Sequence, residues 1–213
     1  MPSPLGHALS GLAVAWIADL VPGRRAWRSA EPSATFYTRA GGALAVICAG
    51  LAASPDLDLF LPSHRTGTHS VTAAFIVTIV AAVVTGQVTR KFTIYNSKFT
   101  MPVARVALMC GAAYASHLLL DWLSIDRFPP RGLQILWPFS QEFFVSGLDV
   151  FVQTERRRIF SAETMRTNLY AMAWEAAMLA PLVLALWLVR VKALARFATE
   201  LTRRDHPSYR GAA

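Results

Sequence analysis

Hydrophobic runs alternate with short polar segments along most of this chain, at a spacing that predicts membrane-spanning helices. A spanning helix needs about 20 mostly apolar residues. Five segments approach or reach that length: residues 5–21, 40–53, 71–88, 103–123 and 168–189. The second is short and rich in glycine and alanine, which favours close packing against the first. The pattern predicts an all-α, polytopic transmembrane helix bundle with about five spans.

The composition supports a membrane protein over a water-soluble domain. Of the 213 residues, 54% are hydrophobic and only 16% are charged, and the mean hydropathy is +0.38. The net charge of +8 comes largely from arginines that flank the apolar runs, which indicates lipid headgroups as partners and argues against nucleic acid. Cys48 and Cys110 lie inside apolar runs without a CxxC pair, so a disulfide framework or thiolate metal site is not expected.

The loops divide the chain and suggest its orientation. We expect one transmembrane domain over residues 1–191, in which residues 124–168 form a long extramembrane or interfacial segment, followed by a basic tail over 192–213. Five spans place segments 22–39 and 89–105 and the tail on one face. These carry four, four and five Lys or Arg residues. The positive-inside rule favours that face, with the C-terminus, as cytoplasmic, although segment 124–168 also carries six.

Polar residues gather at the opposite, outer face. The stretch 55–70 lies there, and the predicted spans bring the ends that carry His7, His117 and Asp121 to the same face, with Glu175 less than two turns away. Ionisable residues within spans are costly and usually functional. The sequence therefore predicts that widely separated polar residues converge on one site.

The spacing of these residues suits metal binding. His117 and Asp121 are four residues apart, which places both on one face of a helix. Asp56 and Asp58 alternate around a leucine, so one can ligate while the other orients a histidine or bridges two ions. The alternatives are a turn or cap for the aspartates and an intramembrane hydrogen bond for the helical pair.

Imidazole and carboxylate without cysteine indicate a catalytic divalent ion, Zn²⁺ before Mn²⁺ or Fe, and one or two ions. A bound ion would activate water, with an aspartate as the base. Asp56, Asp58 and Arg65 are the candidate catalytic residues, Thr68, Ser70 and Glu175 the candidate supporting residues, and Arg127, Arg131 and Trp137 the candidate substrate or interface residues. The candidate ligands are His7, Asp56, Asp58, His64, His69, His117 and Asp121.

Several short motifs occur together in a recognisable order. These are the segments HALSG at 7–11, PDLD at 55–58, HRTGTHS at 64–70, HLLLD at 117–121 and LWPF at 136–139. Over roughly residues 5–145 the sequence resembles the membrane-bound metal-dependent hydrolase family, the YdjM-like, LexA-regulated inner-membrane hydrolases. The resemblance implies a bacterial inner-membrane protein that binds a divalent metal and hydrolyses an ester or phosphoester. The arginine-rich 22–39 linker and the segment 150–168 depart from the family pattern.

These observations favour a hydrolase at the membrane–water interface, with membrane lipids and a small or lipid-like anionic substrate as partners. Arg65 would hold the anion. The alternative is a non-catalytic metal-binding membrane protein or a transporter. A transport site is expected near the midplane with access from both faces, whereas here the polar residues lie at one end. The sequence does not determine the oligomeric state.

Overall fold

The computed structural model describes residues 1–20, 34–60, 65–95, 102–127, 129–155, 158 and 160–205. Over these residues the protein is helical, and the predicted all-α class is confirmed. Its α-helices are α1 (Pro4–Asp19), α3 (Phe36–Arg39), α4 (Gly42–Ala53), α5 (Val71–Tyr95), α6 (Val103–Trp122) and α7 (Ala162–Asp205). Two short 3₁₀ helices, η1 (Ser54–Phe60) and η2 (Gly67–His69), lie between α4 and α5.

Three of the described helices are long and apolar enough to cross a membrane. They are α5 over Val71–Lys91, α6 over Val103–Trp122 and α7 over Ala162–Arg196. The count of five spans is not confirmed, because α1 and α4 contain only 16 and 12 residues. At 1.5 Å per residue, α4 would extend roughly 18 Å, well short of a hydrocarbon core of about 30 Å.

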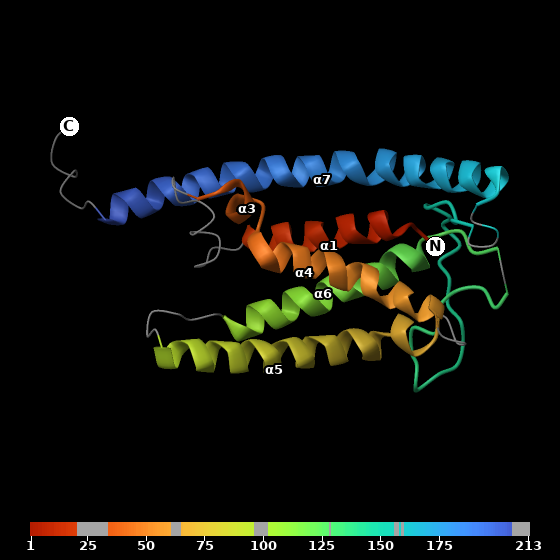
Figure 1. The fold of residues 1–213 in the computed structure, drawn as a ribbon, viewed down its shortest axis with the longest axis horizontal. Coiled ribbons are helices and arrows are strands. Elements are labelled where there is room, and N and C mark those ends of the chain that lie inside the picture. The colour runs from red at the N-terminus through yellow and green to blue at the C-terminus, as the bar shows by residue number, and fades with distance from the viewer. Residues whose placement is uncertain are drawn as a thin grey trace.

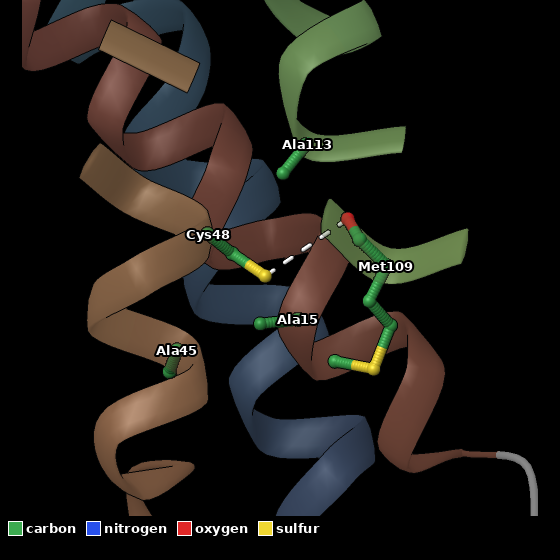
Figure 2. Close-up of a cluster of buried hydrophobic side chains, with 5 residues drawn as sticks. All are labelled: Ala15, Ala45, Cys48, Met109 and Ala113. Atoms are coloured by element: carbon green, nitrogen blue, oxygen red, sulfur yellow. Dashed lines mark hydrogen bonds between the residues drawn. The ribbon is translucent and has the colours of Figure 1, made fainter. Parts of the chain in front are cut away.

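Helices α1 and α4 pack against each other and against α6 (Figure 1). Gly11 of α1 faces the α4 backbone so closely that an added Cβ would lie 2.2 Å from the Cys48 carbonyl oxygen. Cys48 also belongs to a core of small and flexible side chains that fills the junction of the three helices: Ala15, Ala45, Cys48, Met109 and Ala113 (Figure 2). Small residues let helix backbones approach closely, so the short pair is held by packing.

Helix α7 differs most from the sequence expectation. It begins before the predicted span 168–189 and continues through much of the predicted tail to Asp205. It lies along α1, and near the far end of α1 the fully buried Arg190 donates to Asp19 Oδ2 through Nε at 3.0 Å and Nη2 at 2.8 Å. Helix α5 likewise continues to Tyr95, into the segment expected to be a loop.

The polar ends of the helices meet at one end of the bundle. Figure 1 shows the starts of α1, α5 and α7 and the ends of α4 and α6 at the right, together with the chain between α6 and α7. That connecting segment folds over this end through backbone hydrogen bonds, including Gln134 N to Arg65 O at 3.2 Å and Thr154 N to Met1 O at 3.2 Å. The helix ends that carry the predicted polar residues therefore lie at the same end of the bundle.

Candidate metal centre

Four side chains from three elements converge at this end. Asp56 comes from η1, His69 from η2, and His117 and Asp121 from the last two turns of α6. One potential ligand atom from each lies within 4.8 Å of all the others, and all four residues are buried. This cluster can hold a metal ion.

Each histidine in this cluster is oriented through its Nδ1 atom. Nδ1 of His117 lies 2.7 Å from the carbonyl oxygen of Ala52, and Nδ1 of His69 lies 3.1 Å from Oδ2 of Asp58. Both oxygens are acceptors, so both Nδ1 atoms carry the proton and the two Nε2 atoms are left to face the cluster. Such bonds to the second nitrogen are typical of metal-binding histidines.

The two Nε2 atoms lie only 3.1 Å apart, so a proton or a cation must lie between their lone pairs. Two nitrogen ligands of a tetrahedral Zn²⁺, each at about 2.0–2.1 Å, would be separated by about 3.3 Å. Asp121 Oδ2 is 3.2 Å from His117 Nε2 and 3.6 Å from His69 Nε2. The donor types and their spacing fit a divalent ion.

The electrostatics of His69 and Asp56 agree with this arrangement. Burial alone would lower the pKa of His69, but its interactions with Asp56, Asp58 and Asp121 outweigh burial and raise the pKa to about 9. Burial would raise the pKa of Asp56, whereas its bond to His69 and the nearby histidines lower it overall. In the protein without metal, His69 therefore carries a proton at the position facing the cluster.

His7 completes the ring of polar groups. It lies in the second turn of α1 and stacks on His117 with ring centroids 3.8 Å apart. Among the described residues, neither nitrogen of His7 and neither carboxylate oxygen of Asp121 has a hydrogen-bond partner. A buried polar group without a partner costs about 1–3 kcal/mol, and a bound cation would remove that cost for the atoms it contacts.

Asp58 lies outside the group of four and supports it. Its Oδ2 accepts hydrogen bonds from Thr68 Oγ1 at 2.5 Å and from the backbone N–H of Arg65 at 3.3 Å, in addition to its contact with His69. Thr68 is held in turn because Tyr114 donates from its hydroxyl to the Thr68 carbonyl at 2.7 Å. Of the two alternating aspartates, one faces the cluster and the other orients a histidine.

A polar cavity of about 510 Å³ adjoins the cluster through Asp58. Its remaining lining is uncharged: Thr66, Gly67, Thr68, Gln134, Trp137 and Gln141. Trp137 is 39% exposed, and its ring packs against Gly67, where an added Cβ would lie 3.4 Å from the ring. Asp58 is thus both a wall of this cavity and a partner of a candidate ligand.

Of the predicted arginines, one is paired with a carboxylate outside the four-residue cluster and two are exposed. The guanidinium of Arg65 forms an ion pair with Asp126 and contacts Met1 Sδ at 3.1 Å. Arg127 and Arg131 are exposed on the segment that follows α6. The charge of Arg65 is therefore balanced by a neighbouring carboxylate.

The predicted supporting residues have separate roles. Glu175 on α7 accepts two hydrogen bonds from Ser3, at 2.7 Å from its backbone N–H and 2.5 Å from its hydroxyl, and so anchors the start of α1. Ser70 accepts from the backbone N–H of Ala73 at 3.1 Å and caps α5. His64 lies outside the described residues.

Some residues of this region were not anticipated from the sequence. Asp126, Gln134 and Gln141 lie in an irregular segment with no periodicity to mark them. Asp19 and Arg190 pair at the opposite end of α1, and their only sequence signal is that each is a charge near the end of an apolar run.

Comparison with known proteins identifies one relationship. The family model described as YdjM inner membrane protein matches residues 1–197 of the chain. No curated protein and no solved structure matches it.

Proposed function

Since this chain belongs to the YdjM inner membrane protein family, we propose that it is a membrane-embedded, metal-dependent hydrolase of an ester or phosphoester. The observation that supports this most directly is the buried cluster in which two imidazole Nε2 atoms face each other beside two carboxylates. Its position at one end of the bundle, next to a polar cavity, suits a reaction at the membrane–water interface.

The ion would supply an activated water molecule, whose pKa it lowers to roughly 7, and would polarise the scissile group. The ligand set without cysteine favours Zn²⁺, with Mn²⁺ or Fe as alternatives. Asp58 holds His69 in the binding tautomer, and the Ala52 carbonyl does the same for His117. The protein thus contributes a preorganised ligand cage.

Asp56 is the best candidate for the base. Catalytic sites keep one coordination position open, whereas four protein ligands would close a tetrahedral ion. Asp56 Oδ1 lies at 3.8 and 3.9 Å from the two Nε2 atoms, and its side chain is 8% exposed while those of the other three are fully buried. Solvent therefore reaches the cluster most easily beside Asp56, where a carboxylate can accept the proton of an attacking water.

The cavity beside Asp58 is the proposed substrate position. Gln134 and Gln141 can donate to ester or phosphoryl oxygens, and Trp137 offers an apolar face to a lipid-like group. Because Arg65 is paired with Asp126, the metal is the main positive partner for an anionic substrate. The exposed Arg127 and Arg131 would contact anionic headgroups around the site.

The proposed orientation places the metal centre on the periplasmic side and the C-terminal end of α7 in the cytoplasm, as the basic tail favours. In a variant with Cys48 and Cys110 replaced by serine, an impermeant maleimide applied to intact spheroplasts should label Phe139→Cys and leave Thr199→Cys unlabelled. Both positions are exposed. Labelling of Thr199→Cys alone would show that the protein has the opposite orientation.

The decisive experiment combines metal analysis with a substrate panel. Purified protein should contain a divalent ion that is absent in His117→Ala and retained in His206→Ala, which removes a histidine of the predicted basic tail. A panel of phosphoesters and carboxylic esters, with and without chelator, should show chelator-sensitive hydrolysis. Intact metal content in His117→Ala would overturn the proposed site.

The alternative of a non-catalytic metal-binding protein or transporter is favoured by one observation, the complete burial of His69, His117 and Asp121. Closed coordination by protein side chains is typical of structural ions. Bound metal without turnover of any ester in the panel would support that alternative.

A further inference from the structure

We propose that this site holds two divalent ions, and that the second is bound by His7 together with one oxygen each from Asp56 and Asp121. The inference rests on the proposed metal-dependent function and specifies how the site is built. His69 and His117 bind the first ion with the remaining oxygens of the same two carboxylates, so Asp56, the candidate base of a one-ion site, is a ligand when two ions are bound.

His7 is buried next to two carboxylates but forms no hydrogen bond to either of them. Its side chain is fully buried, and neither of its nitrogens forms a hydrogen bond with the described residues. Its Nε2 atom nevertheless lies 3.4 Å from Asp121 Oδ1 and 3.9 Å from Asp56 Oδ2. A neutral imidazole buried in this way loses its interactions with water without replacement, and a cation among these three atoms would replace them.

Both carboxylates are oriented so that their two oxygens face different histidines. Asp121 directs Oδ2 toward His117 at 3.2 Å and Oδ1 toward His7 at 3.4 Å. Asp56 directs Oδ1 toward His69 at 3.8 Å and Oδ2 toward His7 at 3.9 Å. One ion needs only one oxygen from each carboxylate, whereas this division is the arrangement required of two bridging ligands.

The spacing of the stacked rings of His7 and His117 suits a pair of ions. His7 and His117 are stacked with centroids 3.8 Å apart and planes inclined by 22°, and their Nε2 atoms approach the two oxygens of one carboxylate. The 3.8 Å between the ring centroids is close to the roughly 3.5–4 Å that separates the metals of two-metal hydrolytic sites.

The two positions differ in how their histidines are supported. His69 and His117 each hold a polar partner at Nδ1, whereas the Nδ1 atom of His7 has none among the described residues. Such supporting bonds raise metal affinity about 10–100-fold. The His7 position should therefore bind its ion more weakly and fill second.

Charge indicates what the second ion does. Two divalent ions carry four positive charges against the three carboxylates Asp56, Asp58 and Asp121, which leaves one positive charge in a buried site. An anionic phosphoester would compensate this excess, a role that the paired Arg65 does not fill. A two-ion site therefore favours a phosphoester over an uncharged ester.

The test uses full-length protein in detergent, stripped with chelator and titrated with Mn²⁺. Bound Mn²⁺ is counted after gel filtration, and electron paramagnetic resonance reports spin coupling between neighbouring ions. We expect two ions per chain with a coupled spectrum in the wild type and in His206→Gln, and one ion with an uncoupled spectrum in His7→Gln.

The outcomes separate this inference from the proposed function. One uncoupled ion in the wild type would overturn the second site and leave a single-metal hydrolase intact. Two coupled ions in a folded His7→Gln variant would overturn the assignment of His7. No bound ion in the wild type would overturn the metal-dependent function itself. If His7→Gln does not fold, the wild-type stoichiometry and spectrum still decide between one ion and two.

Discussion

Replacing Asp58 by asparagine should weaken metal binding although Asp58 lies outside the four-residue ligand cluster. The carboxylate lies 3.1 Å from His69 Nδ1 and keeps the proton there, so that Nε2 faces the metal. Asparagine preserves the shape but removes the charge and can present its amide hydrogens to Nδ1, which favours the wrong tautomer. Loss of such a supporting carboxylate typically costs 10–100-fold in metal affinity, or about 1.4–2.7 kcal/mol.

The assay is competition of Asp58→Asn and wild type against a fluorescent chelator at pH 7.5. Gln141→Ala is the matched control, because it alters the same cavity without contacting His69. The dissociation constant should rise 10–100-fold in Asp58→Asn and change less than threefold in the control. An unchanged constant in Asp58→Asn would show that Asp58 does not orient His69. A complete loss of binding would show that it is a ligand.

The remaining predictions concern packing, a buried ion pair and pH. Gly11→Ala should lower the melting temperature in detergent, with a cost of about 1–3 kcal/mol in stability, because the new Cβ meets the α4 backbone. The control Gly50→Ala should leave the melting temperature unchanged, because nothing lies within 4 Å of the added Cβ. Equal effects of the two substitutions would contradict close α1–α4 packing. Asp19→Asn leaves the buried Arg190 charge without its carboxylate and should cost about 3–5 kcal/mol in stability. The double variant Asp19→Asn/Arg190→Met should recover part of that lost stability. The number of ions bound, measured by calorimetric titration, should be unchanged in Asp19→Asn and in the double variant. Because a proton on His69, with its pKa of about 9, must leave before metal binds, affinity should rise with pH up to about 9, and a flat profile between pH 7 and 9 would contradict this order.

The long apolar helices could be predicted because their signal is local. Helices α5, α6 and α7 overlap three predicted spans, since about 20 apolar residues are sufficient to identify a helix in lipid. The short pair α1 and α4 could not be judged in this way. Helices of these lengths are part of the bundle because α1 packs against α4, α6 and α7. That packing depends on contacts such as Gly11 with Cys48.

The candidate ligands were identified from residue type, but their roles were not. His117 and Asp121 share a helix face whatever surrounds them, so their spacing predicted a pair. The sequence predicted that one of Asp56 and Asp58 ligates while the other orients a histidine or bridges two ions, but which aspartate has which role depends on the 3₁₀ geometry of η1. Arg65 was predicted to face a substrate, and its pairing with Asp126 depends on how the segment after α6 folds back.

The sequence by itself determined that this is a helical membrane protein of the YdjM family, with histidines and carboxylates gathered toward one end. Hydrophobicity and helical spacing are local properties, and each segment carries them alone. Only the tertiary structure decided which polar atoms face one another: that the Nε2 atoms of His69 and His117 lie 3.1 Å apart, and that His7 stacks beside them. Such distances depend on helix crossings and loop paths that bring together residues separated by up to about a hundred positions, and no local pattern encodes them.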